Sequence, residues 1–147
     1  MANQKIKYYF LAFGIGIVLL LLIQLIPYGK NHNNPAVISE PNWNSQLTLN
    51  LAKRACFDCH SNETIWPWYS NVAPVSWLVY RDVAEGRRRM NFSDWQNIRL
   101  REPGEVPSVI SEGEMPPFQY LLMHKSAKLS TVEKTQFVDG LLKTISQ

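Results

Sequence analysis

The chain has 147 residues with 15 Lys and Arg, 12 Asp and Glu, and 46% hydrophobic residues, which suits about one globular domain and excludes disordered, collagen-like and low-complexity classes. Two cysteines are too few for a disulfide framework. The net charge of +3 is too small for the concentrated basic face of a nucleic-acid binder, so no nucleic-acid partner is expected.

The first predicted element is a single membrane-spanning helix. Residues 8–26 contain no charged residue, and 19 residues at about 1.5 Å each approach the roughly 30 Å hydrocarbon core of a bilayer. Lys5 and Lys7 precede this run, so the positive-inside rule places the N-terminus in the cytoplasm and the rest of the chain on the outer, periplasmic face of the cytoplasmic membrane. A cleaved signal peptide is the alternative, although its apolar region is usually shorter.

We predict three parts along the chain: an anchor over residues 1–28, a linker over residues 29–44 and one domain over residues 45–147. The linker is rich in Asn and Pro and has no apolar period, which is typical of a tether. The remaining domain of about 100 residues has only a small core of its own.

The domain is predicted to be all-α. Residues 45–55 carry apolar residues at helical spacing, and a second helix begins at Pro74 and runs through a charged stretch to Met90. Capping-box patterns at residues 93–96 and 130–133 predict a short helix to about Arg101 and a last helix. The apolar stripe expected on that last helix consists of Phe137, Val138, Leu141, Leu142 and Ile145.

The stretch between these two capping boxes contains prolines at positions 103, 107, 116 and 117, which we expect to break it. No segment of the chain shows a sustained alternation of apolar and polar residues. Strands are therefore not expected.

One short motif carries chemistry. Residues 56–60 read CFDCH, the C-x-x-C-H pattern of haem c attachment. Thiols three positions apart on a helical turn project to the same side, so Cys56 and Cys59 can each form a thioether with a porphyrin vinyl group. His60 then supplies an imidazole nitrogen to the iron. The expected cofactor is one covalently attached haem c.

The cysteine pair has three other interpretations. A structural disulfide gives His60 no task, and a thioredoxin-like redox pair needs a strand before the motif. A zinc site needs four ligands, and only His32 and His124 remain as further nitrogen donors. The haem interpretation also agrees with the predicted export of the domain.

The second axial position of the iron needs a donor, a water molecule or nothing. Met115 is the leading candidate, because Pro116 restricts it to extended conformations and a thioether is a weak ligand that benefits from a rigid loop. His/Met ligation raises the reduction potential and suits an electron carrier. His124 is the alternative distal ligand. Met90 follows the arginines on a probable helix and has no rigid support, and core packing explains Met123 as well.

Aromatic and basic residues near the motif have two open interpretations each. Trp66 and Trp68 either form a packed aromatic corner or line the haem. The arginines at positions 87–89 form a solvated face, or one of them pairs with a haem propionate.

In order along the chain, these features resemble class I c-type cytochromes: helix, C-x-x-C-H, proline, Met-Pro and a closing helix. The resemblance implies that the Pro74 carbonyl accepts a hydrogen bond from His60, and that Met115 is the distal ligand. Residues 129–133 are similar to the start of that family's last helix. The chain departs from the family where Leu51 and Ala52 replace its usual glycine and aromatic pair.

Four longer stretches look like the membrane-anchored bacterial haem-binding domain proteins: residues 55–64, 66–70, 73–77 and 113–117. That resemblance covers about residues 45–145 and implies covalent haem binding by an exported domain with a cytochrome c-like fold. It also places Trp66, Trp68 and Pro74 in motifs expected around the haem.

The sequence therefore predicts a mono-haem domain that transfers one electron at the outer membrane face, between redox partners that it does not identify. An electron carrier is favoured over an enzyme, because an iron with six ligands has no open position for a substrate. Two alternatives stay open. One is a small haem peroxidase or oxygen-reacting enzyme with His124 as its distal acid or base, and the other is a haem-based sensor or accessory subunit.

Overall fold

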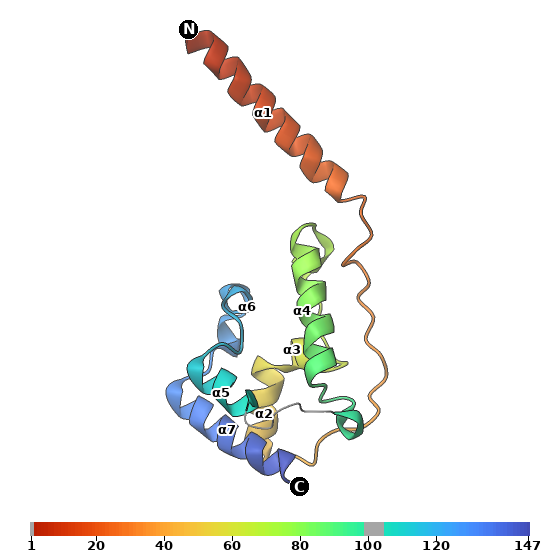
Figure 1. Cartoon of the computed structure of the whole chain (residues 1–147), viewed down its shortest axis with the longest axis vertical. Coiled ribbons are helices and arrows are strands. Elements are labelled where there is room, and N and C mark those ends of the chain that lie inside the picture. Colours follow the sequence, from red (N-terminus) through yellow and green to blue (C-terminus); the bar gives the residue numbers. More distant parts are fainter. Residues whose placement is uncertain (1, 99–104) are drawn as a thin grey trace. The chain divides into compact units, whose positions relative to one another are not determined.

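The computed structural model describes residues 2–98 and 105–147, and within these ranges it is all-helical (Figure 1). This confirms the all-α prediction. The only strand-like pairing among the described residues is an isolated parallel bridge between Ser39 and Asp94. The α-helices are α1 (Ala2–Ile23), α2 (Gln46–Ala55), α3 (Phe57–His60), α4 (Val75–Arg89), α5 (Glu105–Glu112), α6 (Phe118–Met123) and α7 (Thr131–Ile145).

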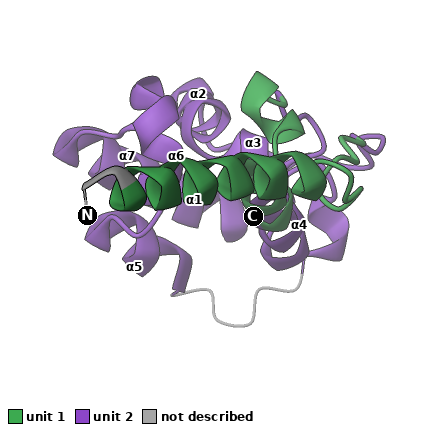
Figure 2. Ribbon diagram, turned by 90° about the horizontal axis from the view of Figure 1, so that it is seen from above, with its two compact units in different colours: residues 1–33, 66–81 green, residues 34–65, 82–147 purple. Residues whose placement is uncertain are grey.

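The chain forms two compact units, coloured separately in Figure 2. Unit 1 comprises residues 1–33 and 66–81, and unit 2 comprises residues 34–65 and 82–147. The anchor, linker and domain predicted from the sequence have different boundaries, at 28/29 and 44/45. That division remains a prediction.

In unit 1, helix α1 carries the predicted apolar span. Residues 4–23 form a segment of 20 residues that is long and apolar enough to cross a membrane, and none of it is buried. The predicted span ended at Ile26, whereas the helix ends at Ile23 and residues 24–26 continue as hydrogen-bonded turns. The rest of unit 1 is a 3₁₀ turn (Trp68–Asn71) and the first half of α4.

In unit 2, the core lies where α2 crosses α7. Phe137 and Ala52 have no exposed surface, and Leu51 and Leu141 are almost as deeply buried. A Cβ built on Gly140 would overlap the Thr48 side chain, so the two helices approach closely at a glycine on the closing helix.

Helix α7 begins as predicted, because Ser130 accepts from the Glu133 amide and the Glu133 carboxylate accepts from the Ser130 amide. These contacts and Arg54, 2.6 Å away, lower the pKa of Glu133 to about 2. The predicted apolar stripe is wrong at Leu142, which is 42% exposed.

The prediction that prolines break the stretch before α7 is wrong at Pro107. Pro107 is the third residue of α5, where the missing amide hydrogen has no intrahelical partner to lose. Pro116 and Pro117 lie between α5 and α6, where the stretch is broken as predicted, and Pro117 is the N-cap of α6. Pro103 lies outside the described residues.

The predicted capping box at residues 93–96 is also wrong. The described part of this segment is a single 3₁₀ turn (Trp95–Asn97) without a side-chain cap, while the stretch to Arg101 lies outside the described residues. Ser93 is buried, and its hydroxyl accepts instead from the Asn62 amide at 2.9 Å. A tertiary contact has replaced the local cap.

The extended segment 34–44 is bonded into unit 2 at several points. Asn62 donates to the Ala36 carbonyl at 2.9 Å, and the Ser93 carbonyl accepts from the amides of Ile38 and Ser39. Trp43 packs against the core, and the Asn44 amide donates to the Thr144 hydroxyl at 3.1 Å. These contacts fix a segment that its composition describes only as a tether.

Candidate functional site

The C-x-x-C-H motif forms a single helical turn in unit 2. Cys56 caps α2 and precedes α3, and its carbonyl accepts from the amides of Cys59 at 3.1 Å and His60 at 2.8 Å. Both cysteines are free thiols. The local backbone thus brings two thiols and an imidazole together on one turn, as the spacing predicts.

The imidazole of His60 is oriented by the backbone at the end of α4. Its Nδ1 lies 2.9 Å from the Met90 carbonyl oxygen. Because a carbonyl only accepts, Nδ1 carries the proton and Nε2 keeps its lone pair for a metal. Desolvation lowers the pKa of His60, and the hydrogen bond to Met90 opposes it. The ring is therefore held in the neutral state that ligation requires.

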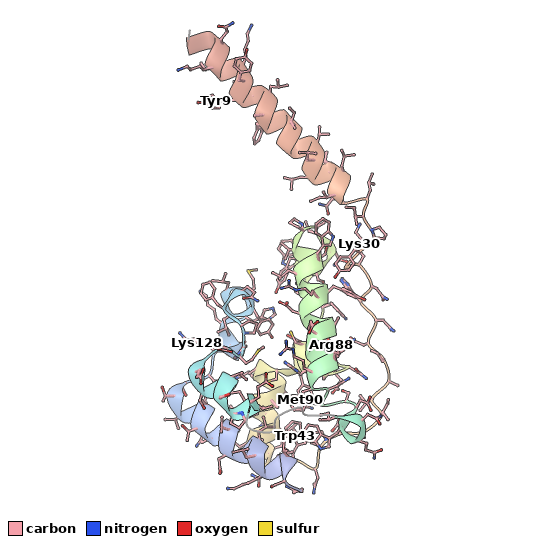
Figure 3. The ribbon with its side chains drawn as sticks, viewed as in Figure 1. Tyr9, Lys30, Trp43, Arg88, Met90 and Lys128 are labelled. Atoms are coloured by element: carbon pink, nitrogen blue, oxygen red, sulfur yellow. The ribbon has the colours of Figure 1, made fainter. Side chains whose placement is uncertain are left out.

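The acceptor for His60 differs from the one that the cytochrome resemblance implied. Pro74, in unit 1, was expected to offer its carbonyl, but that carbonyl accepts from the Trp77 amide at 3.1 Å within α4. Figure 3 shows Met90 where α4 ends. A second backbone bond, from the Phe92 amide to the His60 carbonyl at 2.7 Å, fastens the same stretch to the motif.

Helix α4 touches the motif at a glycine. A Cβ built on Gly86 would overlap the carbonyl group of Cys59, and Gly86 is buried. The backbones of α4 and the motif can approach this closely only because position 86 has no side chain. Sequence reasoning did not single out Gly86, since a helical glycine alone does not reveal its neighbour.

The loop that follows His60 is a buried polar network rather than a surface turn. Ser61, Asn62 and Thr64 are at most 6% exposed. Arg87 donates to the Ser61 carbonyl at 2.8 Å and to the Thr64 hydroxyl at 2.9 Å, so it braces this loop. These loop residues belong to residues 55–64, one of the stretches that look like the haem-binding domain proteins. In the structure they form the hydrogen-bonded loop next to the motif.

The three arginines differ in role. Arg87 is committed to the loop, and it also donates to the Asn34 side chain at 2.8 Å. Arg88 and Arg89 form exposed ion pairs with Glu85 at 2.7 and 3.6 Å. The solvated-face interpretation therefore holds for Arg88 and Arg89.

An aromatic cluster packs behind the motif. Phe57 stacks on Phe92 with centroids 5.4 Å apart, and Trp43 and Trp95 contact Phe92 at 5.1 and 6.0 Å. The His60 ring lies 6.5 Å from Phe92. Trp66 and Trp68, the aromatic residues proposed from sequence, belong to unit 1, where Trp66 stacks on His32 and Trp68 is 75% exposed.

A second polar connection joins the motif to α6. The Tyr120 hydroxyl donates to the Asp58 carboxylate at 2.7 Å, and the other Asp58 oxygen accepts from the Ile65 amide at 3.0 Å. Tyr120 also stacks on His124 with centroids 4.2 Å apart. The structure thus links the middle of the motif, through Tyr120, to the alternative distal ligand.

The candidate distal donors near α6 lie before this helix and at its C-terminal end. The Met115 amide donates to the Val109 carbonyl at 3.0 Å, and Met115 is 37% exposed. His124 caps the C-terminus of α6, and Met123 is 59% exposed. The side chain of Met90 belongs to the buried core, whereas the exposure of Met123 contradicts the packing interpretation given for it.

Both thiols are shielded from ionisation in this fold. Desolvation, followed by the charge of Cys59, raises the pKa of Cys56 to about 12. Desolvation and the nearby carboxylates of Asp82 and Asp58 raise the pKa of Cys59 to about 12, against a smaller lowering by Arg87. The thiols are therefore neutral around pH 7.

The bond between Tyr120 and Asp58 yields a direct prediction. Replacing Tyr120 with Phe removes a hydrogen bond to a carboxylate, and we expect a loss of about 1.5–3 kcal/mol in the free energy of unfolding. In a double-mutant cycle with Asp58→Ala, measured by urea unfolding in detergent, the two changes should be strongly non-additive. Additive effects would contradict a direct bond.

These residues suit a haem bound by two thioether links and one imidazole. The donor set is two neutral thiols and a histidine Nε2 on one turn, backed by stacked aromatic rings. A carbonyl partner on the second ring nitrogen is the usual way in which proteins orient a ligating histidine. Within the described residues, no group of three or more His, Cys, Asp and Glu residues could hold a bare metal ion.

Comparison with known proteins gives one finding that agrees with this geometry. The model of the family described as a haem-binding domain matches residues 18–143, which is most of the chain. Searches of the curated proteins and of the solved structures found no match. The chain belongs to the haem-binding domain family.

Proposed function

We propose that the protein binds one haem c covalently and carries single electrons at the outer face of the cytoplasmic membrane. Cys56 and Cys59 form the thioether links, and His60 ligates the iron through Nε2. The observation that carries this proposal is the hydrogen bond of 2.9 Å from His60 Nδ1 to the Met90 carbonyl. His60 lies on the same helical turn as both thiols. A disulfide would not need an oriented imidazole.

Bound haem supplies a one-electron iron couple, and this chain's residues set its surroundings. The carbonyl of Met90 increases the basicity of His60 through the shared proton. The rings of Phe57 and Phe92 exclude water behind the imidazole. Burial of this kind is one of the factors that set the reduction potential of a haem iron. Helix α1 holds the domain at the membrane, with Lys5 and Lys7 on the cytoplasmic side.

A reduced-minus-oxidised spectrum in alkaline pyridine tests attachment. Protein matured in a host with the haem c attachment machinery should give the spectrum of a porphyrin with two saturated side chains. It should also keep its haem on a denaturing gel. A colourless, folded protein would overturn the proposal.

Met115 is the distal ligand in this proposal, which gives a spectroscopic prediction. The Met115→Ala variant should lose the weak red absorption band of a thioether bound to ferric iron, and its reduction potential should fall because His/Met ligation raises it. Met123→Ala is the matched control and should keep both. A parent protein that lacks this band would make His124 the ligand to test next, and a band that persists in Met115→Ala would assign the thioether to another methionine.

A second candidate function is a small peroxidase or oxygen-reacting haem enzyme. The specific observation in its favour is the connected set of Asp58, Tyr120 and His124, which places acid and base groups in contact with the motif. Such an enzyme needs an open iron position. Rapid binding of carbon monoxide or cyanide to the resting protein would favour the enzyme, and slow or absent binding would favour the electron carrier.

A further inference from the structure

Residues 64–80 form an uncharged segment that follows the haem motif. They contain no Asp, Glu, Lys or Arg. Trp68, Val72 and Val75 within it are 75%, 45% and 43% exposed. The segment is also rich in the Trp and Tyr residues that gather at membrane interfaces. Its aromatic residues are Trp66, Trp68, Tyr69, Trp77 and Tyr80.

The middle of this segment is bonded to the end of the apolar helix within unit 1. The Gln24 side chain donates to the Ala73 carbonyl at 2.9 Å and accepts from the Ala73 amide at 2.9 Å. Gln24 is the first residue after α1. The two bonds pair the amide and the carbonyl of Ala73 with one side chain directly after the end of α1.

Three residues that follow α1 make further contacts between the same two segments. A Cβ on Gly29, whose φ is +77°, would overlap the Ser76 carbonyl, so the backbones nearly touch there. Tyr28 meets Tyr80 edge to face at 5.4 Å. His32 stacks on Trp66 at 4.4 Å, and its Nε2 donates to the Ser70 carbonyl at 3.0 Å. The residues that follow α1 thus run along the uncharged segment.

The depth of the exposed side chains follows from these contacts. The headgroup region adds about 5–8 Å on each side of the hydrocarbon core. If α1 spans the core, Gln24 lies at its edge, and Ala73 is one hydrogen bond away. Val72 and Val75 are one and two residues from Ala73, so they lie within the headgroup region.

We propose that Trp68, Val72 and Val75 enter the phospholipid interface of the membrane that α1 spans. This gives the protein a second, shallow attachment and rests on the proposed anchor. Lipid is the expected occupant because the surface is continuous with the apolar helix through Gln24. Lys30, labelled in Figure 3 beside the start of α4, supplies a cation for anionic headgroups.

Site-specific photo-crosslinking tests this surface in the full-length, haem-loaded protein. Benzoylphenylalanine is placed singly at positions 68, 72 and 75, and at position 18 in the apolar part of α1. The protein is reconstituted in nanodiscs of phosphatidylethanolamine and phosphatidylglycerol and irradiated. Lipid adducts are then measured by intact mass. We expect adducts at positions 68, 72 and 75 as well as at position 18.

The outcomes separate the two proposals. Lipid adducts at position 18 but none at 68, 72 and 75, or adducts there to protein only, would overturn the shallow attachment and leave the anchor intact. No lipid adduct at position 18 would overturn the anchor and the attachment with it. In the Gln24→Leu background, yields at 72 and 75 should fall several-fold while position 18 is unchanged. Unchanged yields at 72 and 75 would overturn the role of Gln24.

Discussion

Replacing both Cys56 and Cys59 with serine is expected to leave no haem on the polypeptide after denaturation. A serine hydroxyl does not form the thioether, and these are the chain's only cysteines. Each single replacement should keep one link, and its absorption bands should shift to longer wavelength because one vinyl group stays conjugated with the porphyrin. A haem-stained denaturing gel and the intact mass report the number of links directly.

The double variant should also be markedly less stable. Haem that stays only by ligation from His60 is a dissociable ligand, whose stabilisation depends on its free concentration and amounts to about 4 kcal/mol at a thousandfold excess over the dissociation constant. Thermal unfolding with and without added haem measures this difference. Covalent haem in the double variant, or single variants with two saturated side chains, would contradict the assignment of the two thiols.

Replacing Gly86 with alanine is the second large effect that we expect. In an ordinary helix this change stabilises by up to about 1 kcal/mol. Here the new methyl group would overlap the carbonyl of Cys59, a backbone group that cannot rotate away. Overpacking of this kind costs about 1–3 kcal/mol, so we expect a net loss of stability. The yield of haem-loaded protein should fall with it.

The matched control for Gly86→Ala lies two residues earlier in the same helix. Ala84 is exposed, so Ala84→Gly reports the helix propensity difference alone and should destabilise by about 1 kcal/mol. Urea unfolding of the haem-loaded protein in detergent compares the two variants. A Gly86→Ala protein that is more stable than the parent would show that α4 does not touch the motif as described.

Local signals in the sequence predicted several features correctly. The helix over residues 45–55 and the start of α4 after Pro74 follow from apolar spacing, and the cap of α7 follows from Ser130 and Glu133. The turn that brings Cys56, Cys59 and His60 together is also local, because it depends only on spacing. Such features need no knowledge of the rest of the fold.

The features that sequence reasoning missed depend on distant contacts. Ser93 has the local pattern of a helix cap, but the Asn62 amide uses its hydroxyl. Pro107 was expected to break a helix, yet it lies in a first turn where it is tolerated. Trp43 lies in a stretch whose composition indicates a tether, and its ring belongs to the aromatic cluster around Phe92.

The candidate site was predicted only in part, because some of its residues act through contacts that are distant in the sequence. Its covalent motif is contiguous, so the sequence identified it. Its supports are not contiguous: Gly86 matters through the carbonyl of Cys59, and Tyr120 through the carboxylate of Asp58. Neither a glycine at position 86 nor a tyrosine at position 120 indicates, from the sequence alone, which residue it contacts.

The acceptor on the Nδ1 side of His60 has a consequence for how this site can vary. The acceptor is the main-chain oxygen of residue 90, which every amino acid carries. Mutations that alter the side chain at position 90 can change packing but cannot delete that oxygen. The tautomer of the imidazole is therefore set by the backbone conformation. Related chains can preserve it even when they carry different amino acids at this position.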